Sequence, residues 1–314
     1  MNRSKLEEDL TFITQEDVEI QIIIYALVGD ANSVKKLDVK ANDLPDILSL
    51  FKRSIKEKLI DNKNYSVLPL SSADERGNCY YEYDLELPED LSVLNKVIGN
   101  DNIENFDFRA ENISDINSLI IVISSGNNHI SLYKKLTPVE KIIGRGSYLL
   151  WKADQRFEKF EDNLLRISPS FQMIRINGTI IVLKIELLEK SFGFVDVITR
   201  EALSGVKAIQ EMNIVSNIET LQELVGDVKF ARKLTKIARN SPVIVKAVPN
   251  VEIIRFTKEH PALKGKIRYN ADESQITLDT KISKDLFIKL LNDDFLTSEL
   301  TRSYYESLAK DDVL

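Results

Sequence analysis

The chain has 314 residues, of which 43% are hydrophobic and 29% are charged, enough for a packed core and a charged surface. No apolar run approaches the ~20 residues that span a bilayer. Residues 1–12 contain three acids where a signal peptide needs an apolar segment. A single cysteine, Cys79, excludes internal disulfides and multi-cysteine metal sites. We therefore expect a cytoplasmic protein that does not insert into a membrane.

The net charge of −7 conceals an uneven distribution. Residues 1–115 contain 13 Lys or Arg and 24 Asp or Glu, whereas residues 229–268 contain 11 Lys or Arg and two Asp or Glu. Because binding depends on the local field, the basic segment indicates an anionic partner despite the acidic total. The acidic stretch 82–115 is most simply a solvated face, and the alternatives are a mimic of DNA and a docking surface for a basic partner.

Residues 1–135 are predicted to form an acidic, mixed α/β domain. β-Branched residues predict a buried strand over 17–27, and apolar residues at helical spacing predict a helix over 44–60. Further predicted elements are a strand over 80–85, a short helix over 90–99, and a hairpin of strands 118–124 and 129–135. Prolines and glycines then break the pattern between 136 and 148, so we place the domain boundary there.

Residues 136–314 are predicted to form a helix-rich, basic C-terminal domain that opens with a β-hairpin. Asn177-Gly178 lies between two apolar runs and is typical of a type I′ turn, in which both residues need positive φ. Helices are expected near 186–191, 195–211, 216–225, 228–239 and 250–259, followed by a strand pair near 266–279 and a terminal helix near 283–310. The whole chain is assigned to the α+β class.

The predicted helix 228–239 is the strongest candidate binding surface. Five cations fall within about 120° of its circumference, opposite its apolar residues: Lys229, Arg232, Lys233, Lys236 and Arg239. No acid lies among them to offset a repulsion of a few tenths of a kcal/mol per pair. A polyanion such as DNA is therefore favoured as the counter-charge. The alternative is a solvated face neutralised by the acidic domain, within one chain or across a dimer.

A second candidate basic group lies around the domain boundary: Lys134, Lys135, Lys141, Arg145 and Lys152. Tyr133, Tyr148 and Trp151 are interleaved with these cations, a mixture found where bases stack, although core packing is favoured for Trp151. The loop Gly144-Arg145-Gly146-Ser147 lacks the remaining residues of the known nucleotide-binding motifs. No cofactor is therefore expected.

Carboxylates are the candidates for catalysis. Glu186, Glu189 and Lys190 could be arranged as in a metal-dependent nuclease, but the preceding strand lacks the acids that a Mg²⁺ site needs. With only two histidines, the sequence has no local signature of Ser-His-Asp or Cys-His catalysis. We predict no catalytic residue and no metal, and keep two alternatives open: a nuclease, and an interaction scaffold without DNA affinity.

An ordered set of apolar motifs carries a family resemblance. Asn163-Leu164-Leu165-Arg166-Ile167 is followed by Phe171, by the Asn177-Gly178 hairpin and by the segment LEKSFGF at 188–194. This order resembles the KwaB-like family of the Kiwa anti-phage system, best over residues 130–260. The resemblance implies a protein that binds DNA, blocks phage replication or expression, and is recruited to the inner membrane by a KwaA-like partner. We also expect a homodimer, because twofold dimers are common among soluble proteins.

Overall fold

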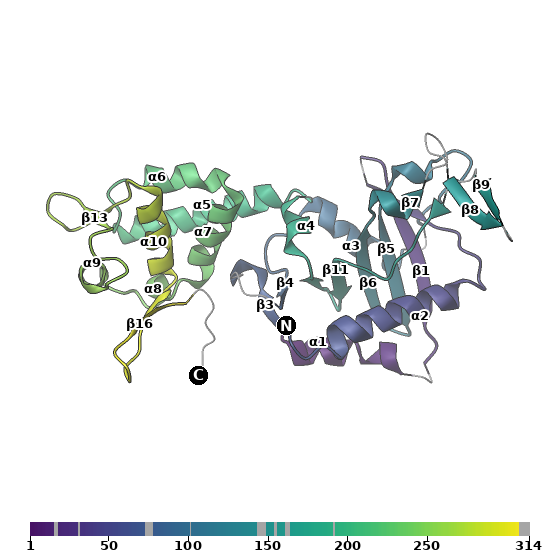
Figure 1. Cartoon of the computed structure of the whole chain (residues 1–314), viewed down its shortest axis with the longest axis horizontal. Coiled ribbons are helices and arrows are strands. Elements are labelled where there is room, and N and C mark those ends of the chain that lie inside the picture. The colour runs from purple at the N-terminus through teal and green to yellow at the C-terminus, as the bar shows by residue number, and fades with distance from the viewer. Residues whose placement is uncertain are drawn as a thin grey trace. The chain divides into compact units, whose positions relative to one another are not determined.

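The computed structural model describes residues 1–15, 18–30, 32–72, 78–100, 102–142, 149–153, 156–160, 164–190 and 192–307. The chain forms two compact units. The first comprises Met1–Val67, Tyr80–Glu82 and Glu89–Leu187, and the second comprises Leu68–Cys79, Tyr83–Pro88 and Leu188–Leu314. Helices and an eight-stranded sheet confirm the predicted α+β class (Figure 1).

The first unit is organised around the sheet, whose strand order is β2-β1-β5-β6-β11-β12-β4-β3. Its described pairings are antiparallel. The strands are β1 Gln21–Val28, β2 Ser33–Lys36, β3 Ser66–Pro69, β4 Cys79–Glu82, β5 Ile116–Ser125, β6 Asn128–Lys135, β11 Met173–Ile176 and β12 Thr179–Val182. In the turn between the last two, Asn177 and Gly178 have φ of 47° and 84°, as the sequence predicts.

The division between the units differs from the boundary predicted at 135/136. β11 pairs with β6, with Ile174 opposite Leu132, so the predicted C-terminal hairpin is central to the first sheet. Its short apolar strands need partners on both sides, and β6 and β4 supply them. The main division follows Leu187 instead. The prolines and glycines of 136–148 mark a connection within one unit.

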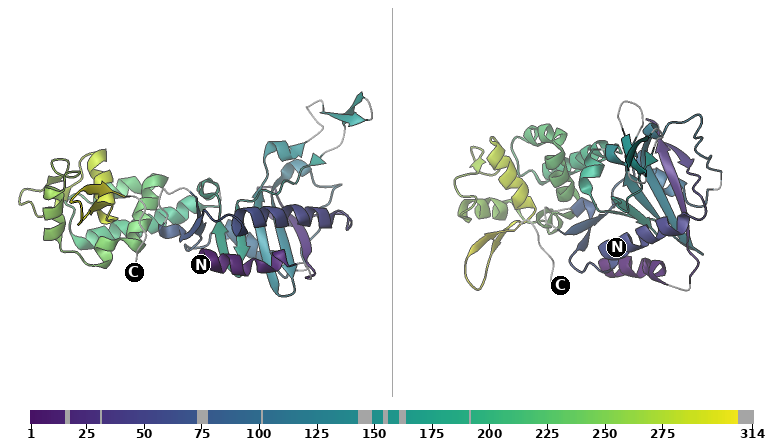
Figure 2. Two further views of the ribbon diagram at one scale, coloured as in Figure 1. Left: turned by 60° about the horizontal axis from the view of Figure 1, so that its bottom comes forward. Right: turned by 45° about the vertical axis from the view of Figure 1, so that its right-hand side comes forward.

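Helices cover both faces of this sheet. Alternate strand residues such as Ile24, Ile121 and Leu132 form one core, over which α1 (Arg3–Asp9) and α2 (Leu44–Ile55) lie (Figures 1 and 2). The opposite face contacts α3 (Val93–Lys96), where the Ser131 hydroxyl donates to the Leu94 carbonyl at 3.3 Å. The remaining elements are η1 Thr11–Thr14, a π-helical turn Lys56–Ile60, η4 Glu89–Ser92, η5 Ile113–Asp115, η6 Pro138–Glu140, β7 Lys141–Ile142, β8 Leu149–Ala153, β9 Arg156–Phe160, β10 Leu164–Leu165 and α4 Ile185–Glu189. η3 (Leu70–Ser72) belongs to the second unit.

The second unit is mainly helical. Its elements are α5 Phe194–Met212, α6 Glu219–Gln222, η7 Glu223–Gly226, α7 Val228–Asn240, α8 Pro242–Val245, α9 Asn250–Glu259, β13 Arg268–Tyr269, β14 Ile276–Thr277, α10 Lys281–Leu291, β15 Phe295–Thr297 and β16 Tyr304–Glu306. The packing of α5 on α7 is close because Gly205 faces the Leu234 backbone, leaving no room for a β-carbon. This contact holds the basic helix against its neighbour.

The terminal helix predicted over 283–310 is wrong. α10 ends at Leu291, because Asn292 and Asp293 are poor helix formers and Asp293 adopts a positive φ of 56°. A hairpin of β15 and β16 follows. The rings of Phe295 and Tyr304 from this hairpin pack on buried His260, and these contacts hold the hairpin in place.

Replacement of Gly205 by Ala tests the α5–α7 contact. The added methyl would lie inside van der Waals contact of the Leu234 carbonyl, and overpacking of this kind costs about 1–3 kcal/mol. We expect the free energy of unfolding in urea to fall by that amount, although alanine favours a helix over glycine. Ser204→Ala, at the exposed neighbouring position, is the control and should change it little. An unchanged or raised stability of Gly205→Ala would contradict the close packing.

Candidate functional site: the basic face of α7

α7 presents its cations on one side, as predicted. Asp227 caps the helix and accepts from the backbone N–H groups of Lys229 at 2.9 Å and Phe230 at 3.3 Å. The side opposite the cations is buried and comprises Phe230, Ala231, Leu234, Thr235 and Ile237. The packing of this apolar side therefore turns the row of Lys229, Arg232, Lys233, Lys236 and Arg239 outward.

Carboxylates from other helices compensate part of this row. The Lys233 Nζ lies 2.9 Å from the Asp285 carboxylate on α10, and Arg239 binds both oxygens of Glu201 on α5 at 2.8 and 3.0 Å. Arg239 also donates to the Asp84 carbonyl at 3.2 Å. The inference that the row lacks acidic partners is therefore corrected, because acids distant in sequence reach α7 through tertiary packing.

The ion pairs shift the pKa values of cations on α7 and of the carboxylates that bind them. Hydrogen bonds to Glu201 raise the pKa of Arg239. Burial acts to raise the pKa of Asp285, but hydrogen bonds from Lys233 and Lys289 outweigh it and lower that pKa. Lys229 is exposed, whereas Arg232 and Lys236 are half-buried and make contacts of their own. The face thus keeps its five cations, and carboxylates of described residues hold Lys233 and Arg239.

Lys134, a predicted phosphate contact, is fully buried in the first unit. Its Nζ lies 2.6 Å from Glu140 Oε1, and 2.7 and 2.9 Å from the hydroxyls of Ser168 and Ser170. Burial acts to raise the pKa of Glu140, but hydrogen bonds from Lys134, Ser168 and Thr137 together lower it to about 2. Lys134 therefore belongs to an internal ion pair and is removed from the candidate DNA surface.

The rest of the second group does not form one described surface. Lys135 is half-buried, with its backbone N–H bound to the Gln172 side chain at 2.8 Å. Lys141 donates to the Ser114 carbonyl at 2.9 Å. Arg145 lies outside the described residues, and Lys152 lies on β8 without a described side chain. These residues belong to the first unit, whereas the α7 row belongs to the second.

The expected aromatic stacking partners are also revised. Tyr133 is buried, with its hydroxyl 2.5 Å from the Ser118 hydroxyl, so it does not offer a ring to a base. Tyr148 lies outside the described residues, and the side chain of Trp151 on β8 is not described. The second basic group therefore carries no argument for nucleic-acid binding.

Sequence reasoning missed the carboxylates that pair with Lys134, Lys233 and Arg239. One had a local signal: Thr137-Pro138-Val139-Glu140 has the spacing of a capping box, and Glu140 does bind the Thr137 backbone and hydroxyl, each at 3.0 Å. Asp285 and Glu201 had none, because they lie on other helices.

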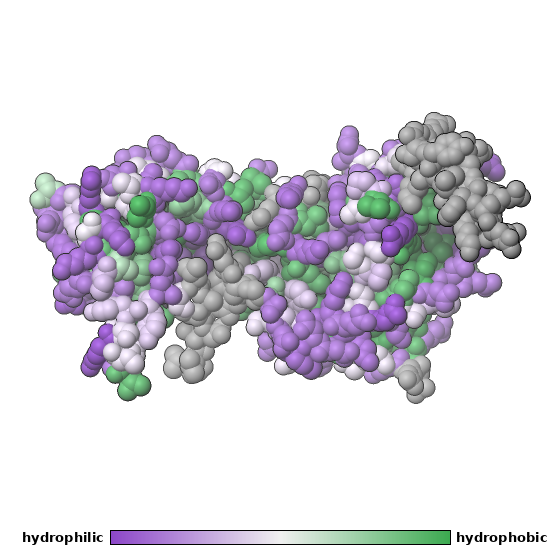
Figure 3. Space-filling view, viewed as in Figure 1, coloured by the Kyte–Doolittle hydropathy of each residue, from purple (hydrophilic) through white to green (hydrophobic). Residues whose placement is uncertain are grey.

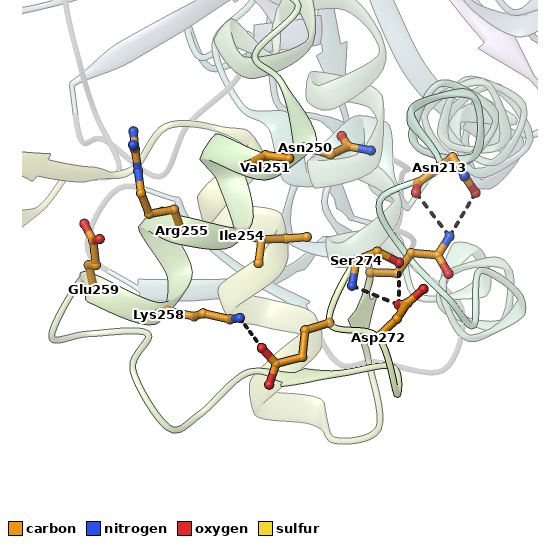
Figure 4. Close-up of a pocket in the computed structure, with 11 residues that line it drawn as sticks. Asn213, Asn250, Val251, Ile254, Arg255, Lys258, Glu259, Asp272 and Ser274 are labelled. Atoms are coloured by element: carbon orange, nitrogen blue, oxygen red, sulfur yellow. Dashed lines mark hydrogen bonds and ion pairs between the residues drawn. The ribbon is translucent and has the colours of Figure 1, made fainter.

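The second unit also contains a cavity of about 690 Å³ between α9 and the β13–β14 turn (Figure 4). Lys258 crosses it to Glu273 at 2.5 Å, Gln275 donates to both oxygens of Asn213 at 3.1 and 2.9 Å, and Asp272 accepts from Ser274. Many of its polar groups thus bind one another, and the lining as a whole indicates no ligand class. Among the described residues, no three His, Cys, Asp or Glu side chains gather as metal ligands.

The comparison with known families follows from residues that span both units. A sequence model described as "Kiwa protein KwaB-like" matches residues 113–301, more than half of the chain. The chain belongs to the KwaB-like family. The curated Kiwa protein KwaB of Escherichia coli O55:H7 (strain RM12579 / EPEC) is 27% identical over 317 residues, covering 99% of each chain. No solved structure matches the chain. Membership in the KwaB-like family confirms the resemblance of the apolar motifs and supports a role in anti-phage defence.

Replacement of Glu140 by Gln tests the buried pair. The change leaves the Lys134 ammonium buried without its counter-charge, so we expect the free energy of unfolding at pH 7 to fall by about 3–5 kcal/mol. Glu273→Gln, which breaks the exposed pair with Lys258, is the matched control and should cost less than about 1 kcal/mol. Urea unfolding monitored by circular dichroism measures both. Equal effects of the two changes would contradict the structural role of the Lys134–Glu140 pair.

The pH dependence gives a second readout of the same variant. Folding lowers the pKa of Glu140 from 4.5 to about 2. The contribution of the ionised Glu140 carboxylate to the free energy of unfolding is therefore fully present above pH 4.5 and is lost as the pH falls through about 2. The stability difference between wild type and Glu140→Gln should therefore shrink over that window.

Proposed function

We propose that this KwaB-like protein is an anti-phage defence protein that binds the phosphate backbone of DNA without reading its sequence. The observation that carries the proposal is the outward row of five cations on α7. This row lies within residues 229–268, which contain 11 basic and two acidic residues. A field of this kind attracts phosphate at physiological salt. The result would be interference with phage DNA replication or expression.

The ion pairs on α7 are compatible with this role. The side chains of Lys233 and Asp285 are each 33% exposed, and those of Arg239 and Glu201 are 39% and 20% exposed. Partly exposed pairs contribute little net stability, about 0–1 kcal/mol toward the exposed limit. A phosphate can therefore share or replace the carboxylate at low cost. The carboxylates hold the row in place when no DNA is bound.

The geometry favours contact with phosphates over base edges. Base recognition relies on planar groups such as arginine placed bidentately against guanine. Three of the five cations are Lys residues, which are point charges without such geometry, and Arg239 binds Glu201 with its fork. The expected interaction therefore positions the protein on DNA and carries no sequence information.

Charge reversal of Lys229 and Lys236 to Glu tests the DNA surface, leaving Lys233 to hold Asp285. Each neutralised phosphate contributes about 0.9 to the slope of log K against log salt, so the slope should flatten by ~1.8 for every duplex sequence tried. The matched control, Lys96→Glu with Lys184→Glu, changes exposed lysines of the first unit and should bind like wild type. Fluorescence anisotropy at several salt concentrations measures this, with thermal melting as the folding check.

A folded Lys229/Lys236 variant with wild-type affinity and slope would contradict the proposed surface. Parallel gels with and without Mg²⁺ separate the other candidates. Cleavage that requires the metal would favour a nuclease, and the absence of any binding would favour an interaction scaffold.

The proposal includes a homodimer recruited from the cytoplasm to the inner membrane by a KwaA-like partner. In the described part of the chain, no helix is long and apolar enough to cross a membrane. The acidic stretch 82–115 supports recruitment by protein contact: Phe108 is 58% exposed among acids, with its ring against Phe106. Aromatic residues, Phe included, are enriched in the cores of protein interfaces, which are surrounded by a polar rim.

Co-expression with a KwaA-like protein tests the recruitment. The protein alone should stay in the supernatant and scatter light as a dimer of the 35.8 kDa chain, and with the partner it should move to the membrane fraction. Phe108→Ala should reduce that shift, because it removes the proposed anchor, whereas Val251→Ala, an exposed apolar change in the second unit, should not. Membrane association without the partner, or no shift with it, would contradict the proposed recruitment.

A further inference from the structure

A cluster of basic residues on α2, distinct from the two basic groups described above, lies in the first unit at a cavity of about 490 Å³ between η1 and α2. Lys52, Arg53 and Lys56 line one side of this cavity. Pro45 and Leu48 supply apolar wall, and Thr14 and Ser49 also line the cavity. The Thr14 hydroxyl donates to the Thr11 carbonyl at 2.9 Å. Its volume is in the range of cavities that bind small molecules.

The cavity follows from the periodicity of α2. Its lining positions 45, 48, 49, 52, 53 and 56 repeat at three- and four-residue spacing and so share one helix face. Phe51, Ser54 and Ile55 lie on the other face and are buried. The core therefore fixes the direction in which the cations point, and the view of Figure 3 shows a hydrophilic surface over α1 and α2.

The three cations have no compensating partner among the described residues. None of Lys52, Arg53 and Lys56 makes an ion pair or a side-chain hydrogen bond there, and Glu57, four residues after Arg53, does not pair with it. Like charges at this spacing repel by a few tenths of a kcal/mol per pair. The α7 row has tertiary carboxylates, but this cluster has none in the described part of the chain.

Stabilisation of the helix C-terminus does not account for the cluster. Cations are favourable in the last turn, where they face the negative end of the helix dipole. Here the helical backbone continues from Lys56 through a π-helical turn to Ile60, so Lys52 and Arg53 lie about two turns before its end. The helix dipole therefore does not offset the charges of Lys52 and Arg53. π-Helical turns occur often at functional sites.

We propose that this cavity binds a nucleoside triphosphate. The three cations match a polyphosphate that carries several negative charges, and the Ser49 hydroxyl can donate to its oxygens. The apolar wall of Pro45 and Leu48 suits the base or sugar, which a phosphate alone would leave unfilled. The site lies in the first unit, so the proposal is independent of DNA binding by α7.

Isothermal titration of the full-length protein with ATP, pyrophosphate and adenosine tests the site. We expect saturable binding of ATP at one site per chain, weaker binding of pyrophosphate that competes with ATP, and no binding of adenosine. Lys52→Ala with Lys56→Ala should weaken ATP binding by about tenfold or more, because two charge-assisted contacts are lost. The matched control, Lys36→Ala with Lys40→Ala, removes two exposed lysines of the same unit outside the cavity and should bind ATP like wild type.

Several outcomes would overturn the proposal. These are no saturable ATP binding by the wild type, equal affinity in the folded Lys52/Lys56 variant, or binding of adenosine as tight as that of ATP. If the wild type binds anionic phosphatidylserine vesicles but not ATP, and the Lys52/Lys56 variant loses that vesicle binding, the cluster is instead a membrane-binding surface. Because the Lys229/Lys236 variant keeps this cavity, it should bind ATP normally, which separates failure of this site from failure of the DNA surface.

Discussion

The antiparallel pairing of β6 with β11 joins segments that are separate in the sequence, and the rest of the first unit depends on it. Ile130, Leu132 and Tyr133 lie opposite Ile176, Ile174 and Met173, so the strands extend one sheet with continuous apolar faces. α1 and α2 cover one of these faces, and α3 contacts the other. The same pairing places Ser168 and Ser170, just before β11, at the ammonium of Lys134 near the end of β6. Loss of the β6–β11 register would therefore expose both the core and a buried charge.

Charge compensation distinguishes the three basic groups of the chain. Lys134 is fully buried and held by Glu140, so it serves the fold. The α7 row is partly compensated by Asp285 and Glu201 yet remains at the surface, where a phosphate can compete with the carboxylates. The α2 cluster has no described partner and lines a cavity of its own. The environment of each cation, rather than the count of basic residues, decides which group can receive an anion.

The two proposed anion sites lie in different units and differ in shape. The α7 row is a convex helix face suited to an extended backbone, whereas the α2 cluster lines a concave cavity suited to a small ligand. A protein of the KwaB-like family with both sites could respond to nucleotide in one unit and contact DNA with the other. Coupling between them would appear as a change in DNA affinity when ATP is present, and by linkage as an equal change in ATP affinity when DNA is present.

Short-range patterns were sufficient for most elements and for the family. The type I′ turn at Asn177-Gly178, the Asp227 cap and the amphipathic α7 follow from turn, capping and periodicity rules that involve only neighbouring residues. The order of apolar motifs likewise indicated the KwaB-like family. Tertiary structure alone decided which strands pair and which charged side chains form ion pairs. Strand partners, the division after Leu187, the burial of Lys134 and the carboxylates that reach α7 all depend on contacts between residues distant in sequence, which local propensity does not encode.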